Sequence, residues 1–252
     1  MKTSIHIENK LISKPSRLGF KYHIKTFGCQ MNEHDSEKIA GIFNSDGMSK
    51  SEDIDQADIL FVNTCTIREN ADDKLYGTLG HLKKWKEQSS DRRLIVGGCA
   101  AQKDKELVRD RAPWVDVVIG THNTNDVINL LNQSEDWGPI TKIVEETLDI
   151  ETEILPVRES GFSAFVTIQI GCNNSCTFCI VPSVRGVEIS RRPSDIINEI
   201  KNLSKEGVKE ITLLGQNVNS YGRDLMIDNK RSPYFTQLLY KIHEIDGIER
   251  IR

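Results

Sequence analysis

The sequence lacks several features that would assign it to a common class of proteins. No stretch of its 252 residues approaches the run of about 20 apolar residues that a membrane helix needs, which predicts a soluble protein without a membrane partner. The net charge is -4, with 33 Lys and Arg against 37 Asp and Glu, so overall charge does not indicate a nucleic-acid partner. P-loop, G-x-G-x-x-G and G-x-S-x-G motifs are absent too, which leaves no motif evidence for phosphate-binding loops or serine-hydrolase chemistry.

The N-terminal stretch lacks the apolar core of a secretory signal, so we expect a loose arm over residues 1–20 and a cytoplasmic protein. Thiols stay reduced in the cytoplasm, so six cysteines in this chain favour metal binding or catalysis over a disulfide framework. Scattered buried cysteines are the alternative. Three of the six lie within residues 172–179, which argues against scattering.

Three segments of β-favouring residues each end in cysteine: 21–29, 57–65 and 92–99. Apolar residues at helical spacing follow the first two, and strands that alternate with helices predict an α/β protein with a parallel sheet. Ligands bind at the carboxyl ends of such strands, so we expect Cys29, Cys65 and Cys99 to converge there. Three isolated structural cysteines could also occupy that edge. We predict a Rossmann- or flavodoxin-like domain over residues 21–134.

Residues 135–153 break the alternation, with seven acidic residues and one lysine. We expect an acidic linker over residues 135–160. A second series of strands and helices then occupies residues 161–252 and ends in what resembles the start of a third strand. Two and a half such units cannot close a barrel, so this second domain is expected to be incomplete.

The stretch "GCNNSCTFCIVP", residues 171–182, contains Cys172, Cys176 and Cys179 in a C-x3-C-x2-C pattern. Structural zinc takes four ligands, usually from two C-x2-C pairs or a Cys/His mixture. This chain has one C-x2-C pair and no histidine between His122 and His243, which disfavours a zinc module. Iron-sulfur clusters are also held by thiolates. A cubane held by three cysteines leaves one iron open to another ligand.

This pattern, with Phe178 before the last cysteine, resembles the signature of the radical S-adenosylmethionine (SAM) enzymes. Further stretches resemble the methylthiotransferase family, and most closely its tRNA branch, the MiaB type. They are "FGCQMNEHDSEKIAG", "NTCTIRENADDKLYG", "GGCAAQ", "RAPWVDVVIGTHN", "EISRRP" and "TLLGQNVNSYG", in that order along the chain. The resemblance runs from about residue 21 to residue 252.

The resemblance implies two 4Fe-4S clusters, SAM and a tRNA substrate. Cys172, Cys176 and Cys179, which we call the loop triad, would hold the cluster that binds SAM and cleaves it to a radical. Cys29, Cys65 and Cys99, which we call the strand-end triad, would hold a second cluster that carries the sulfur. The implied reaction is methylthiolation at C2 of N6-(dimethylallyl)adenosine at position 37 of tRNA.

The resemblance also implies the domain names and the other partners. Residues 21–134 would be the methylthiotransferase N-terminal domain and residues 161–252 part of a radical SAM domain, without the small C-terminal TRAM domain of full-length relatives. An electron donor such as flavodoxin or ferredoxin is expected, and a monomer. Alternatives are a threonylcarbamoyladenosine tRNA substrate, a ribosomal-protein substrate, or a non-catalytic fragment that binds iron-sulfur clusters.

Arg185, Arg191 and Arg192 lie just after the loop triad and are candidates for substrate binding through tRNA phosphates. A solvated basic turn is the alternative.

Gln216 and Asn217 follow a predicted strand, where the functional loops of a barrel emerge. Together with Phe178 they are candidates for SAM binding. The alternative is that the two polar residues are ordinary loop formers.

Overall fold

A six-stranded parallel sheet forms the core of the N-terminal half of the computed structural model, which describes residues 17–66, 70–145, 156–158, 160–226 and 232–252. The strand order is β2-β1-β3-β4-β5-β6, with every neighbouring pair parallel. The strands are β1 (Lys21–Thr26), β2 (Ser49–Lys50), β3 (Ile59–Thr64), β4 (Arg93–Gly98), β5 (Val117–Ile119) and β6 (Ile140–Lys142). All six residues of β3 are buried, as expected for a strand covered on both faces.

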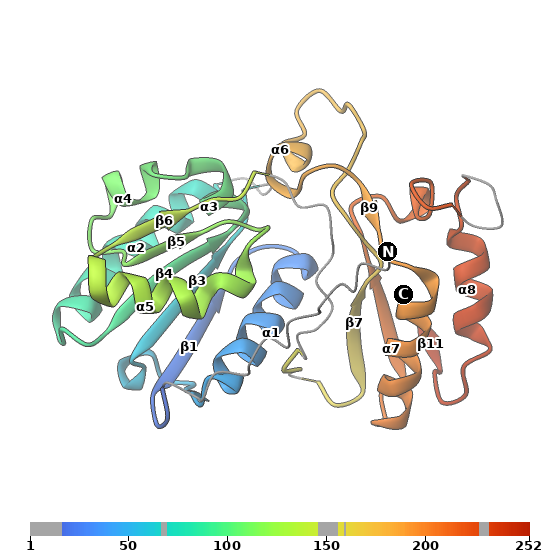
Figure 1. Cartoon of the computed structure of the whole chain (residues 1–252), viewed down its shortest axis with the longest axis horizontal. Helices are drawn as coiled ribbons and strands as arrows, with labels where there is room; N and C mark the ends of the chain where they lie inside the picture. The colour runs from blue at the N-terminus through green and yellow to red at the C-terminus, as the bar shows by residue number, and fades with distance from the viewer. Residues whose placement is uncertain (1–16, 67–69, 146–155, 159, 227–231) are drawn as a thin grey trace, which may run out of the picture.

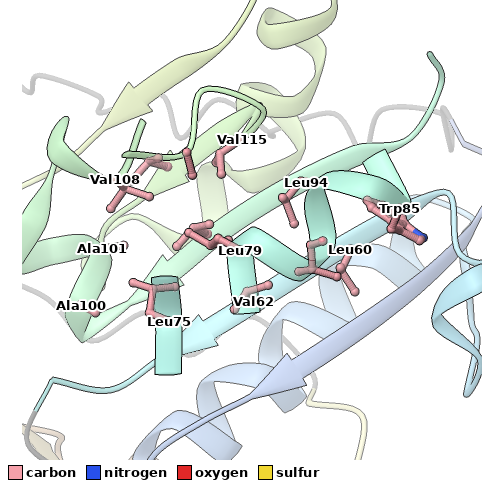
Figure 2. Close-up of a cluster of buried hydrophobic side chains, with 14 of the residues drawn as sticks. Leu60, Val62, Leu75, Leu79, Trp85, Leu94, Ala100, Ala101, Val108 and Val115 are labelled. Atoms are coloured by element: carbon pink, nitrogen blue, oxygen red, sulfur yellow. The ribbon is translucent and has the colours of Figure 1, made fainter. Parts of the chain in front are cut away.

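Helices cover both faces of this sheet (Figure 1). They are α1 (Gln30–Ser45), α2 (Ala71–Glu87), α3 (Cys99–Asp104), α4 (Leu107–Arg111) and α5 (Val127–Trp137), with single 3-10 turns η1 (Ile54–Gln56) and η2 (Thr124–Asp126). Alternate strand residues face opposite helices because strand side chains have a period of two. Leu60 and Val62 of β3 pack with Leu79 of α2 (Figure 2), whereas Phe61 packs with Phe43 of α1.

The structure differs from the expected linker in residues 135–142. Helix α5 continues to Trp137, and Ile140–Lys142 forms β6, which pairs with β5 at the sheet edge. Three residues are enough for an edge strand, and Ile140 packs against the core despite the acidic residues around it. Residues 146–155 and 159 of the expected linker lie outside the described residues.

The expected N-terminal arm lies outside the described residues up to position 16. Its remaining part is held in place, because Arg17 is buried and forms ion pairs with Asp46 at 3.2 Å and Glu135 at 3.1 Å. Residues 17–20 therefore belong to the N-terminal domain.

The second half contains a parallel sheet in the order β11-β10-β7 and a separate antiparallel pair. The sheet strands are β7 (Ser163–Thr167), β10 (Glu210–Leu214) and β11 (Arg250–Ile251), and the pair is β8 (Gln169–Ile170) with β9 (Ile189–Ser190). The helices are α6 (Val181–Arg185), α7 (Pro193–Lys205) and α8 (Phe235–His243), with the 3-10 turn η3 (Val218–Ser220). Ile196, Ile200 and Leu203 of α7 recur at helical spacing and are buried in one apolar cluster with β7 and β10.

The two halves contact each other through α3 with α6 and through α1 with β7. Figure 1 shows α6 between the two sheets and α1 on the side of the first sheet that faces β7. His34 of α1 lies edge-on to Phe165 of β7, with ring centroids 6.3 Å apart. Among the described residues no helix is long and apolar enough to cross a membrane.

Candidate iron-sulfur and SAM site

The strand-end triad lies at the carboxyl ends of three neighbouring strands. Cys29 precedes α1 after β1, Cys65 follows β3 directly, and Cys99 begins α3 directly after β4. Because β1, β3 and β4 are adjacent in the sheet, the three cysteines share one edge. A side chain at Gly28, beside Cys29, would come within 2.9 Å of the Cys65 Cβ atom. The structure thus places at one sheet edge cysteines that are 36 and 34 residues apart in sequence.

A buried amide pair holds the loop of Cys29 against the end of β3. The Asn32 amide donates to Asn63 Oδ1 and to the Thr64 carbonyl oxygen, each at 3.1 Å. The Asn63 amide in turn donates to the Asn32 carbonyl oxygen at 2.8 Å, and Asn32 Oδ1 lies 3.4 Å from Cys29 Sγ. Both asparagines are fully enclosed. A buried amide without partners costs about 1–3 kcal/mol, so this pair fixes the position of Cys29 relative to Cys65.

Gly98 allows β4 to approach β3 directly before Cys99. Its φ is +89°, and a Cβ atom there would lie 2.4 Å from Asn63 Oδ1 and 2.5 Å from the Thr64 carbonyl oxygen. Only glycine adopts this backbone conformation readily. Any larger residue would separate Cys99 from the end of β3.

Cys99 is 1% exposed, and burial raises the pKa of its thiol. Arg185 of α6 opposes that shift, because its Nε–H donates to Cys99 Sγ at 3.3 Å. Cys65 lies close enough to raise the pKa of Cys99 a little further. An ion pair of 2.7 Å joins Arg185 to Asp35 of α1. Burial alone would lower the pKa of Arg185, but Asp35 and Cys99 raise it above its ordinary value, so the guanidinium stays charged.

The loop triad is more exposed than the strand-end triad. Cys172 is buried just after β8, whereas Cys176 and Cys179 are exposed. The Cys179 amide donates to the Cys176 carbonyl oxygen at 3.1 Å, which makes a turn between them. A cavity of about 410 Å³ lies beside Cys172 and is lined by Asn173, Asn174, Pro182, Ser183, Val187 and others.

Gly171 fixes the start of that loop. With φ at +71°, a Cβ atom there would lie 1.9 Å from the Val187 carbonyl oxygen. The Cys172 amide donates to the Gly186 carbonyl oxygen at 3.1 Å. The loop is therefore attached at its base and free of buried contacts at its tip.

Both triads match iron-sulfur clusters in donor type, because thiolate sulfur is the usual ligand of iron in such clusters. Among the described residues, no group of three His, Cys, Asp and Glu side chains has an arrangement that could hold a metal ion. The match therefore rests on the sulfur-only donor sets, on the shared sheet edge of one triad and on the eight-residue loop of the other.

A cleft of about 810 Å³ lies between the two halves and reaches Cys65 of the strand-end triad. Cys65 and Gly28 line it from the first half, and Arg158, Ser163 and Phe165 from the second. A ligand in this cleft could approach Cys65 from solvent.

Two of the three candidate arginines are not on the surface. Arg185 is 5% exposed and paired as described, and Arg191 donates to the Thr167 carbonyl oxygen at 2.8 Å and to Glu199 at 2.7 Å. Both side chains are paired internally in this structure, and their contact with tRNA phosphates stays a prediction. Charges close in sequence do not predict the pairing of Arg185, because Asp35 lies 150 positions from it in sequence. Arg192, just before α7, is exposed.

The three candidate SAM-binding residues differ in exposure and in hydrogen bonding. Phe178 is 99% exposed at the tip of the loop. Gln216 follows β10, and its buried Oε1 has no hydrogen-bond partner among the described residues. Asn217 precedes η3, where its carbonyl oxygen accepts from the Ser220 amide at 3.0 Å. Of the three, only Gln216 offers a buried acceptor.

Sequence reasoning missed Asn32, Asn63 and Asp35. A signal for Asn63 was present, because a polar pair ends the otherwise apolar strand "ILFVNT". Asn32 and Asp35 lie in a polar helix start that carries no comparable signal.

Two family models match the chain, one in each half. Residues 21–120 match the family described as Uncharacterized protein family UPF0004, and residues 166–252 match the Radical SAM superfamily. The first match contains the strand-end triad and the second contains the loop triad.

The chain is also similar to curated proteins named tRNA-2-methylthio-N(6)-dimethylallyladenosine synthase. The protein from Mycobacterium bovis is 48% identical over 235 residues, which are 92% of this chain and 46% of that protein. The protein from Parafrankia sp. is 48% identical, over 93% of this chain and 47% of its own length. The chain thus spans about half the length of the relatives it matches.

Solved structures of radical SAM enzymes share the fold. The methyltransferase TsrM from Kitasatospora setae, solved with tryptophan and a SAM analog, superposes with a TM-score of 0.54 at 11% identity, over 88% of this chain and 50% of that one. The cobalamin-dependent enzyme OxsB gives 0.57 at 14% identity, over 92% of this chain and 37% of that one. At these identities the likeness concerns the fold alone.

Proposed function

Since this chain belongs to the radical SAM methylthiotransferase family, we propose that the protein methylthiolates C2 of N6-(dimethylallyl)adenosine at position 37 of tRNA. The observation that carries this proposal is the pair of sulfur-only triads, joined through α6, which follows the loop triad and contacts the helix that begins at Cys99. The names of the relatives supply the substrate.

Two 4Fe-4S clusters and SAM are the proposed cofactors. When bound, they supply radical generation from SAM at one site and a sulfur source at the other. Such chemistry is needed because no side-chain base can usefully remove a proton from this adenine carbon. The strand-end triad would hold one cluster and the loop triad the other.

The chain's own residues would bind, position and shield these groups. Gln216 supports a SAM contact through its buried acceptor at the carboxyl end of β10, where ligands bind in parallel sheets. Phe178, in the cysteine loop, and Asn217, directly after Gln216, would complete the proposed SAM contacts. The cleft that Cys65 lines would admit the target base.

The remaining partners are part of the same proposal. Arg192 is the exposed member of the basic turn and would contact tRNA phosphate. An electron donor such as flavodoxin or ferredoxin would reduce the loop-triad cluster, and the protein would act as a cytoplasmic monomer.

A second candidate is cluster binding without catalysis by the 252 residues alone, since they span about half the length of the relatives. Substrates of the other two branches, threonylcarbamoyladenosine tRNA and a ribosomal protein, are less favoured because the relatives cited above carry the dimethylallyladenosine name.

Mass spectrometry of tRNA nucleosides tests the substrate. Cells without the gene should lose the methylthio group of the modified adenosine, and the intact gene should restore it. Genes with either triad changed to alanine should not restore it, whereas Thr177→Ala, an exposed loop change that removes no thiol, should. Unchanged tRNA together with an altered ribosomal protein would refute the assignment.

A further inference from the structure

Arg185 reaches from one half of the molecule into the other. It is the last residue of α6, directly behind the cysteine loop, and only 5% of it is exposed. Its guanidinium lies 2.7 Å from Asp35 of α1, and its Nε lies 3.3 Å from Cys99 Sγ. One side chain therefore links the segment that carries the loop triad to a member of the strand-end triad.

The charges around Arg185 form a set between α1 and α7. Asp35 of the same helix and Glu199 of α7 are both charged neighbours of Lys38 of α1. Arg191, from the segment before α7, pairs with Glu199 at 2.7 Å. Burial lowers the pKa of Lys38, and the nearby Arg191 and Arg185 lower it further, whereas Asp35 and Glu199 raise it. Groups of both signs therefore gather at the contact between the two halves.

A buried ion pair is weak evidence for stability, because removing two charges from water offsets most of their attraction. Arginine nevertheless suits two partners at once, since its planar guanidinium donates in several fixed directions. Here one edge meets a carboxylate and the Nε–H meets a sulfur. A lysine could keep the first contact but lacks the fixed fork needed for the second.

We propose that Arg185 is a positioning residue that couples the two triads, with Asp35 fixing the guanidinium and the Nε–H bond to Cys99 orienting and tuning the strand-end site. The tuning rests on the proposed function, in which Cys99 is a cluster ligand. Hydrogen bonds to cluster sulfurs are among the factors that set reduction potentials. A positive donor stabilises the more negative reduced state, so this contact raises the potential of the strand-end cluster.

The tuning is tested in a chain whose loop triad is changed to alanine, so that only the strand-end cluster reports. Arg185→Lys, Arg185→Gln and the exposed control Arg192→Gln are compared with this parent by anaerobic redox titration followed by EPR. Both Arg185 variants should shift the midpoint potential to more negative values, and the control should match the parent. If Arg185→Gln does not fold, the midpoint potential of Arg185→Lys alone tests the tuning.

The coupling of the halves is tested by limited proteolysis of the metal-free chain. Arg185→Gln and Asp35→Asn should be cut several-fold faster than wild type, whereas Arg185→Lys and Arg192→Gln should be cut at the wild-type rate. Equal rates in all variants would refute the coupling.

The two hypotheses fail in different ways. A parent chain that binds no iron would refute the proposed function and with it the tuning. Iron retained with the same potential in the parent and both Arg185 variants would refute the tuning while the proposed function stands.

Discussion

The strand-end triad lies on three neighbouring strands, whereas the loop triad lies within one loop of eight residues. Cys65 and Cys99 are buried, but Cys176 and Cys179 are exposed. The first site is therefore positioned by the sheet and by a buried amide pair, and the second by local turns. Damage to the fold should affect the first site more, and damage to one loop should affect only the second.

Gly98→Ala should have the largest effect on stability and should act on the strand-end triad. The new Cβ would meet Asn63 and the Thr64 backbone at a φ that disfavours alanine. We expect a loss of at least about 2 kcal/mol in the free energy of unfolding. Urea denaturation measures this loss, and iron analysis should show that the loop triad still binds.

Gly138→Ala is the matched control, because Gly138 has φ at +86° but no atom within 4 Å of a new Cβ. Its effect reports backbone strain alone. Equal losses for the two variants would show that the close approach at Gly98 does not contribute to stability.

Gly171→Ala should disrupt the loop triad and leave the strand-end triad in place, because its Cβ would meet the Val187 carbonyl.

Asn63→Ala should weaken the strand-end triad selectively. It leaves the buried Asn32 amide without one of its partners, which costs about 1–3 kcal/mol. Chemical denaturation should show the loss and iron analysis should show fewer irons at this site, with the loop triad retained. Asn202→Ala, on the exposed face of α7, should change neither. Equal iron loss at both sites would mean that the amide pair supports the whole fold.

Alkylation of the metal-free chain should separate Cys99 of the strand-end triad from Cys176 and Cys179 of the loop triad by rate. Cys176 and Cys179 are exposed, whereas Cys99 is enclosed and burial raises the pKa of its thiol. Thiolate is the reactive form, so Cys99 should react at least about tenfold more slowly and gain reactivity only at higher pH. Peptide mass spectrometry after timed iodoacetamide treatment measures this. Rapid labelling of Cys99 at neutral pH would contradict the buried position.

Arg192→Gln should have the smallest effect. An exposed arginine that contacts one phosphate contributes about one unit to the slope of binding affinity against salt concentration. We expect weaker tRNA binding by a few-fold and no change in iron content. Lys201→Gln, also exposed on α7, is the control. Equal tRNA affinity for wild type and Arg192→Gln across salt concentrations would remove this arginine from the interface.

The parallel α/β architecture could be predicted from the sequence because strand and helix periods alternate clearly around Cys29, Cys65 and Cys99. The shared edge of those cysteines followed from the same pattern. Strand β6 was missed because three residues among acidic neighbours carry almost no periodic signal. The assignment of all six cysteines as cluster ligands stays a prediction.

The roles of Arg185 and Arg191 could not be predicted from the sequence. Their partners, Asp35 and Glu199, lie on two different helices, and one of these partners belongs to the other half of the molecule. Whether such a charge is buried depends on the contact between the two halves. The number of charged residues nearby in sequence does not predict that contact.

Iron and sulfide analysis after anaerobic reconstitution tests the central claim that two separate triads each hold a 4Fe-4S cluster. Wild-type chain should contain about eight irons with matching sulfide, and changing either triad to alanine should halve both. Zinc without sulfide, or iron unaffected by removal of Cys29, Cys65 and Cys99, would contradict the claim.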